Sequence, residues 1–214
     1  MNLMKERVRS VGEEMVNAAT HGFGAISIVA ALPFLLAAAL EHGGSLAVVS
    51  ASIFAATAMS LYVASMLYHA VPPGRLKSIF QAADHSAIFL LIAGTYTPFM
   101  LGVLRGPWGW SLFGVIWGLA LLGLLAECSG MRRIRSFSVG LYLAMGWLAV
   151  VAIVPMTAHV QFGGLVLIFA GGLAYTIGTV FYAIEQIPYF HAVWHLFVLA
   201  GTGCHFFAVM NYAA

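Results

Sequence analysis

The chain has 214 residues, of which 62% are hydrophobic and only 7% are charged. About 25% of the residues in a typical soluble domain are charged, so this chain has too few to cover a water-exposed surface. We therefore predict an all-α integral membrane protein. The formal net charge of +2 and the scattered basic residues also exclude the concentrated basic face of a protein that binds nucleic acid.

Seven apolar stretches are long enough to cross a bilayer, which takes about 20 residues. They cover residues 17–40, 45–70, 84–104, 108–126, 137–154, 163–183 and 189–211. The breaks between them contain Gly, Pro or charged residues, as loops do. The prediction is a short N-terminal segment, 1–16, followed by a single domain of seven transmembrane helices, 17–211.

The basic residues of this predicted topology fall mainly on one side of the membrane. That side holds Lys5, Arg7, Arg9, Arg75, Lys77, Arg132, Arg133 and Arg135, whereas the other side holds Arg105 alone. By the positive-inside rule the N-terminus is predicted to be cytoplasmic. An odd number of spans then places the C-terminus outside.

Two histidines, His191 and His195, lie four residues apart in the last predicted span. Four residues is about one helical turn, so both rings face the same way. Each ionisable side chain in a membrane helix costs roughly 2 kcal/mol or more, so the pair requires a common partner. A metal ion is the simplest candidate.

The predicted topology brings further polar residues to the same end of the bundle. His69 ends the second span, Ser65 lies one turn deeper on the same face, and Asp84 opens the third span. A set spaced three and four residues apart follows one face into the first span, namely Glu14, Asn17 and His21. Helix ends that are distant in sequence are therefore expected to meet in one polar layer.

Three histidines from two helices match a catalytic zinc site, in which a water molecule takes the fourth position. Asp84 can hold this water and accept its proton, and Ser65 can donate a hydrogen bond to a developing oxyanion. The implied reaction is hydrolysis. Other roles stay open, because Ser65 can simply pack within its helix and Asp84 can cap the third span.

Together these motifs resemble the hemolysin III family, also called the TrhA membrane homeostasis proteins. The motifs are Ser65-x-x-x-His69, Asp84-His85 followed by Ala-Gly-Thr-Tyr-Thr-Pro-Phe at 93–99, His191-x-x-x-His195 and Glu14-x-x-Asn17-x-x-x-His21. That family is related to the progestin and adipoQ receptors, which include the adiponectin receptors, and more distantly to the alkaline ceramidases.

The resemblance implies a seven-helix protein of the bacterial inner membrane, with zinc held by His69, His191 and His195 on the cytoplasmic side. It also implies a water molecule between zinc and Asp84, with Ser65 close by. Glu14, Asn17 and His21 would anchor the first span to the site layer, line its cytoplasmic mouth or support the metal ligands. His85 would support the ligands or lie at the membrane interface.

Adiponectin receptors and alkaline ceramidases are linked to hydrolysis of ceramide-type amides. The resulting hypothesis is a zinc-dependent hydrolase of lipid amides or esters, with membrane lipids as its partners and membrane lipid homeostasis as its role. Two alternatives are a non-enzymatic sensor or regulator with a structural zinc site and a pore-forming, hemolysin-like protein.

A further histidine, His205, lies ten residues beyond His195, which is about 15 Å along a helix axis. It therefore cannot share the metal site. We expect it to be a buried side chain bonded to a neighbouring helix.

Overall fold

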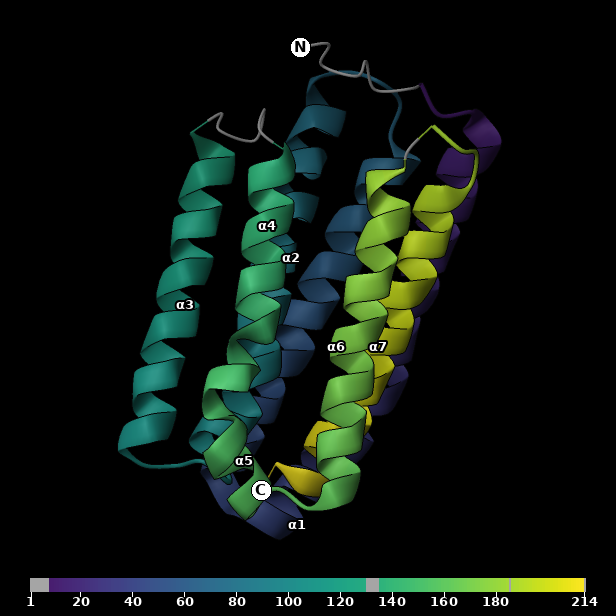
Figure 1. Ribbon diagram of the computed structural model, residues 1–214. Coiled ribbons are helices and arrows are strands. Elements are labelled where there is room, and N and C mark those ends of the chain that lie inside the picture. The colour runs from purple at the N-terminus through teal and green to yellow at the C-terminus, as the bar shows by residue number, and fades with distance from the viewer. Residues whose placement is uncertain (1–7, 130–134, 185, 214) are drawn as a thin grey trace.

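The computed structural model describes residues 8–129, 135–184 and 186–213. This part of the chain is helical and has no strand (Figure 1). Its elements are α1 (Val11–Ala70), α2 (Arg75–Leu101), α3 (Pro107–Cys128), α4 (Arg135–Gly146), the 3-10 helix η2 (Trp147–Ala152), α5 (Ile153–His159), α6 (Phe162–Ala183) and α7 (Phe190–Tyr212).

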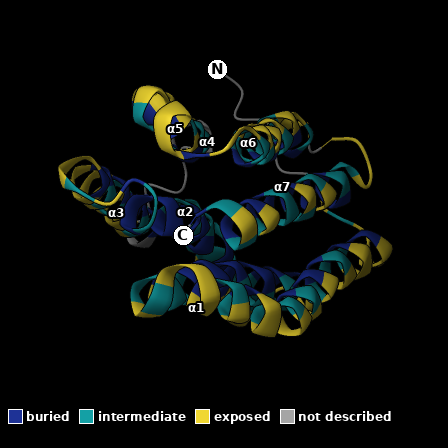
Figure 2. Cartoon of the chain, turned by 90° about the horizontal axis from the view of Figure 1, so that it is seen from below, coloured by how far each residue is buried: buried dark blue, intermediate teal, exposed yellow. Residues whose placement is uncertain are grey.

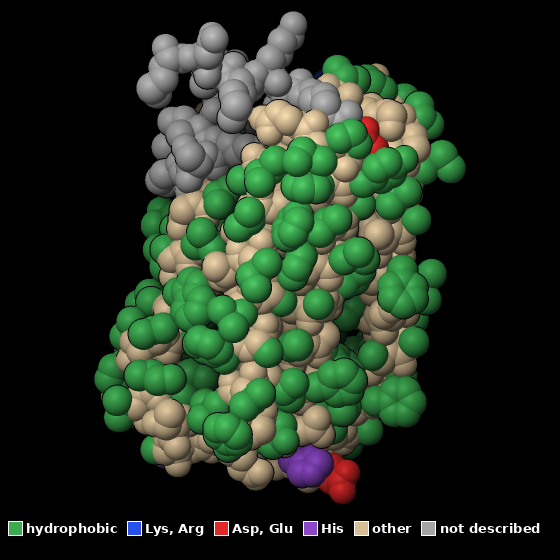
Figure 3. All heavy atoms as spheres, turned by 45° about the vertical axis from the view of Figure 1, so that its right-hand side comes forward, with side chains coloured by type: hydrophobic (Ala, Val, Ile, Leu, Met, Phe, Trp, Pro, Cys, Tyr) green, Lys and Arg blue, Asp and Glu red, His purple; other side chains and the backbone are tan. Residues whose placement is uncertain are grey.

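Six helices in the described residues are long and apolar enough to cross a membrane, with α4, η2 and α5 contributing to one continuous span, Ser138–His159. Hydrophobic side chains cover the face drawn in Figure 3, and ionisable side chains appear only near its two ends. The predicted all-helical, integral membrane protein is therefore confirmed. The predicted inside orientation depends partly on Lys5, Arg7, Arg132 and Arg133, which lie outside the described residues.

Helix α1 is a hairpin of two arms. A straight helix of its 60 residues would be about 90 Å long, but Glu14 near its start contacts His69 near its end. The ring of His21 likewise packs edge-on against Tyr62, with 5.2 Å between centroids. The chain reverses at Gly44, whose φ of 66° and ψ of −155° break the helix. Such positive φ values favour glycine, which has no Cβ.

The first arm begins earlier than the predicted span. Ser10 caps the helix, because its hydroxyl accepts a hydrogen bond from the Glu13 backbone at 3.2 Å. The Glu13 carboxylate in turn accepts one from the Ser10 backbone at 2.9 Å. This capping box fixes the start of α1 at Val11, so residues 11–16 are helical and precede the predicted span in the same arm.

Two predicted boundaries are wrong. Helix α2 begins at Arg75 rather than at residue 84, so Asp84 lies in its third turn and neither opens nor caps the helix. Charged side chains had suggested a loop, but Arg75 and Lys77 occupy the first turn of α2. The predicted loop at 155–162 is also mostly helical, because α5 continues to His159 and its first turn tolerates Pro155.

The helices form layers around α2 and α7. Viewed along the bundle, these two lie between α1 on one side and α4, α5 and α6 on the other (Figure 2). The largest buried cluster joins α1, α2 and α7 through residues such as Phe54, Leu91 and Val198. Close packing of α1 on α2 requires Gly94, since a Cβ there would lie 2.9 Å from the Cβ of Thr57.

Tyr96 of α2 stabilises the break between α4 and η2. Its hydroxyl lies 3.0 Å from the carbonyl of Met145 and 2.7 Å from that of Gly146. The same oxygen accepts a hydrogen bond from the Ala149 backbone at 2.8 Å. Backbone groups released from a helix within a membrane need such partners, so Tyr96 makes this irregular segment tolerable.

We expect Tyr96→Phe to lower the free energy of unfolding by about 1–3 kcal/mol, because it leaves these backbone groups without the hydroxyl. The measurement is the unfolding midpoint in mixed micelles of denaturing and mild detergent. The half-exposed Tyr189→Phe serves as the control and should unfold like wild type. Equal midpoints for all three proteins would contradict this account of the break.

Candidate metal centre

Three buried histidines meet between the two hairpin arms and α7. His69 lies in the last turn of α1, and His191 and His195 lie in the first two turns of α7. Their ring centroids are 4.7–5.1 Å apart, and each offers one nitrogen within 4.8 Å of the others. Two nitrogens bound to one zinc ion lie at most about 4 Å apart, so small ring rotations are enough for coordination. The three histidines are thus positioned to hold a metal ion.

The start of α7 is tied to the start of α1. Tyr189 precedes α7 in a left-handed conformation, with φ of 64°. Its backbone N–H donates a hydrogen bond of 3.0 Å to the Glu13 carboxylate. Because Glu13 also belongs to the capping box of α1, this contact places the first turn of α7 beside the first turn of α1.

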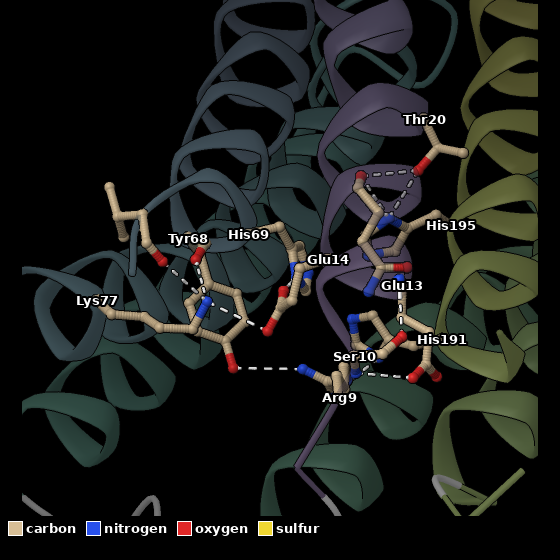
Figure 4. Close-up of polar contacts among 12 residues, drawn as sticks. Arg9, Ser10, Glu13, Glu14, Thr20, Tyr68, His69, Lys77, His191 and His195 are labelled. Carbon is tan, nitrogen blue, oxygen red and sulfur yellow. Dashed lines mark hydrogen bonds and ion pairs between the residues drawn. The ribbon is translucent and has the colours of Figure 1, made fainter. Parts of the chain in front are cut away.

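His69 has the surroundings of a metal ligand. Its Nδ1 lies 2.5 Å from the carboxylate of Glu14, and the other oxygen of that carboxylate lies 3.2 Å from Lys77 Nζ (Figure 4). Its Nε2 is buried and has no hydrogen-bond partner in the described part of the chain. Histidines that bind metals usually donate from the other ring nitrogen to a carboxylate or carbonyl, as His69 can.

His195 has an equivalent arrangement with a backbone carbonyl. Its Nδ1 lies 3.2 Å from the Asn17 carbonyl and 3.0 Å from the Thr20 hydroxyl. Its ring stacks on that of His21, with centroids 3.6 Å apart and planes 11° apart. These contacts fix the ring and leave its second nitrogen for a metal ion.

The contact of His191 is of a different kind. Its Nδ1 lies 3.3 Å from a guanidinium nitrogen of Arg9, and Arg9 also reaches the Tyr68 hydroxyl at 3.5 Å (Figure 4). A guanidinium only donates hydrogen bonds, so Arg9 cannot accept a proton from this ring. In the sequence, Arg9 contributed only to the predicted membrane orientation. Its contact with His191 was not predicted, because the two residues are 182 positions apart and no local pattern connects them.

The polar face of the first arm reaches the histidine group, as Glu14, Asn17 and His21 show. The side-chain amide of Asn17 and both ring nitrogens of His21 are buried, with no hydrogen-bond partner among the described residues. Buried polar atoms without partners are uncommon and point to water or an ion. These side chains therefore belong to the polar layer that was predicted for this end of the bundle.

Asp84 is close to the histidines but outside their ligand group. It lines a small cavity together with His21, His191 and His195, and the space open to the centre of a water molecule is about 10 Å³. That is room for about one water. The Ser65 hydroxyl is buried and makes no hydrogen bond within the described residues.

Two other histidines lie apart from the ligand group. His85 lines the edge of the small cavity, and its Nδ1 lies 3.7 Å from the buried carboxylate of Glu127 on α3. His205 is remote from the group, as predicted. His205 was also predicted to be bonded to a neighbouring helix. Within the described residues its Nδ1 has no hydrogen-bond partner, and its ring stacks on Tyr175 of α6.

The comparisons with known proteins agree with these motifs. Residues 9–206 match the family described as haemolysin-III related. The chain is 43% identical over 209 residues to Hemolysin-3 of Bacillus cereus, which covers 98% of this chain and 95% of that protein. The chain belongs to the haemolysin-III-related family. The region of the family match includes every candidate site residue.

The chain is also similar to two other known proteins. The Hemolysin-3 homolog of Bacillus subtilis is 42% identical over 203 residues, or 95% of each chain. The human monocyte to macrophage differentiation factor is 27% identical over 209 residues, or 94% of this chain and 84% of that protein. The predicted resemblance is confirmed, and the mammalian match agrees with the predicted relation to the progestin and adipoQ receptors.

We expect the purified wild-type protein to carry about one metal ion per chain and His69→Ala, His191→Ala and His195→Ala each to lose most of it, because too few ligands remain. Elemental mass spectrometry measures the ratio of metal to protein. The exposed His42→Ala is the control and should keep its metal. A wild-type protein that stays free of metal after incubation with excess ion would contradict the prediction.

We expect Glu14→Gln to weaken metal affinity by about 10- to 100-fold, because the amide no longer provides a carboxylate for His69. Competition with a chelator of known affinity measures this change. Glu41→Gln, an exposed substitution remote from the site, should bind like wild type. Unchanged affinity in Glu14→Gln would show that the contact between Glu14 and His69 does not support a metal.

Proposed function

We propose that this protein is a zinc-dependent hydrolase of lipid amides or esters in the bacterial inner membrane, where it takes part in membrane lipid homeostasis. The observation that carries this proposal is a group of three buried histidines beside the Asp84 carboxyl, next to a large apolar cavity. The two arms of α1 and the five later spans would give seven passages. The bias of basic residues supports a cytoplasmic position for the histidine group.

Zinc suits this group because three imidazole nitrogens with an open fourth position are typical of its catalytic sites. When bound, zinc would polarise a substrate carbonyl and make a water molecule reactive at neutral pH. Glu14 and the Asn17 carbonyl would hold the rings of His69 and His195 in a fixed orientation.

Asp84 and Ser65 would handle the proton and the developing negative charge. Asp84 is buried and lines a cavity for about one water, so its carboxylate can hold that water and accept its proton. Its absence from the group of three nitrogens in the described structure favours contact through water over direct ligation. The Ser65 hydroxyl can donate a hydrogen bond to the oxyanion that forms when the carbonyl is attacked.

The apolar cavity supplies the lipid part of the proposal. Its volume is about 560 Å³, within the usual range for ligand cavities of about 300–1,000 Å³. Its walls come from α1, α2, α4, η2, α5, α6 and α7. It shares five lining residues with the small cavity at the histidines, namely Leu61, Ile88, Tyr182, Trp194 and Val198. An acyl chain in the large cavity would therefore direct its carbonyl towards the histidine group.

The second candidate is a membrane sensor or regulator with a structural zinc ion. It is favoured by the position of the histidines, which would let one ion cross-link α1 and α7. Structural sites usually have four protein ligands, and the described group has three. A pore is less favoured, since the large cavity is lined almost entirely by apolar side chains rather than by a polar path.

We expect Asp84→Asn to slow hydrolysis by about 10²- to 10⁴-fold while keeping the metal, because an amide cannot accept the proton from water. The measurement is fatty-acid release by zinc-loaded protein from vesicles containing ceramides or glycerophospholipids. Glu41→Gln is the matched control. Hydrolysis would be rejected if zinc-loaded wild type released no fatty acid from either lipid class. Retained metal in such a protein would leave the structural role standing.

A further inference from the structure

The residues that line the large cavity include a histidine, His205. This side chain on α7 is only 6% exposed, and it lies in a cavity wall made mainly of apolar residues. His42 and His159 each satisfy Nδ1 with the carbonyl four residues earlier, at 2.8 Å and 2.9 Å. His205 departs from this pattern, since its buried Nδ1 has no hydrogen-bond partner in the described residues.

The neighbouring helix is shaped to hold this imidazole in place. A Cβ at Gly171 of α6 would lie 2.6 Å from His205 Nε2, so the glycine leaves space for the ring. One turn further along α6, Tyr175 stacks on the ring with 5.6 Å between centroids. Its hydroxyl lies 2.9 Å from that of Thr202, which prevents rotation of the tyrosine away from α7. The ring is therefore held at the cavity, although its Nδ1 has no hydrogen-bond partner in the described part of the chain.

Burying a polar group without a hydrogen bond costs free energy, and in an apolar cavity a ligand can recover that cost. A neutral imidazole can donate from one nitrogen and accept at the other. A ligand hydroxyl can accept a hydrogen bond from the donor nitrogen or donate one to the acceptor nitrogen. A keto oxygen can only accept one from the donor nitrogen. The ligand at this point should thus be apolar along most of its length and carry one oxygen atom.

The distance between the histidine group and His205 indicates the position of this oxygen along the ligand chain. Trp194, Val198 and His205 all line the cavity from α7. His195 and His205 are ten residues apart, or about 15 Å along the axis, which is half of a hydrocarbon layer about 30 Å thick. An acyl chain with its carbonyl at the histidine group would therefore reach His205 well beyond its first carbons.

We propose that His205 forms a specificity subsite for acyl chains that carry a hydroxyl or keto oxygen at mid-chain. The subsite rests on the proposed function in one respect, because the acyl chain is taken to occupy the large cavity. Hydrolysis itself is not required, since binding of a free fatty acid tests the subsite directly.

The experiment compares a mid-chain hydroxystearic acid with stearic acid, both radiolabelled, on full-length metal-loaded protein in nanodiscs. Wild type should prefer the hydroxy acid by about tenfold, the effect of one good hydrogen bond. His205→Leu should lose this preference and keep its affinity for stearic acid, whereas His205→Gln should keep part of it. The exposed His159→Leu is the control and should behave like wild type.

A second variant guards against poor folding of His205→Leu. Gly171→Ala places a methyl group against Nε2 and should also reduce the preference, with metal content reporting that each variant is folded. Equal affinities in wild type, or an unchanged preference in His205→Leu, overturn the subsite but not the cavity. Failure of both acids to bind overturns the subsite and the proposed lipid cavity together. Preference without any hydrolysis supports the subsite and counts against the hydrolase.

Discussion

The contact between Glu14 and His69 is the interaction on which the site depends. It closes the α1 hairpin, whose two arms must lie side by side before His69 can meet α7. It also orients the imidazole, because the carboxylate occupies Nδ1 and leaves Nε2 towards the histidine group. Lys77 from α2 binds the same carboxylate and so connects the third helical segment to this point. The partly exposed Glu14 carboxylate therefore contributes both to the packing of the helices and to the orientation of the ligand.

The need of buried polar groups for hydrogen-bond partners connects the two cavities. Polar groups inside a membrane need partners, and the chain supplies them from its own side chains where it can, as Tyr96 does for the backbone at η2. Where it does not, at Ser65, Asn17, His21 and His205, polar atoms remain buried without a hydrogen bond in the described structure. Of these residues, His21 lines the small cavity and His205 lines the large one. These positions are where water, metal or lipid oxygen has the most to contribute.

The helical content and much of the polar layer were predictable from sequence. Long apolar stretches indicate membrane helices, and the four-residue spacing of His191 and His195 places both on one face. Helix ends were less predictable. The charged residues at 75–77 looked like a loop but form the first turn of α2, since a helix can leave the apolar layer without ending. Asp84 consequently lies within a helix and not at its start.

The sequence by itself determined which side chains are costly to bury and which helical face carries them, because helical spacing and hydrophobicity are local properties. Only the tertiary structure decided which of them touch. Arg9 at His191, His21 stacked on His195 and His205 stacked on Tyr175 are contacts between different helices. Such contacts depend on how the hairpin folds back at Gly44 and how α7 packs against it, and no local pattern along the chain encodes that packing.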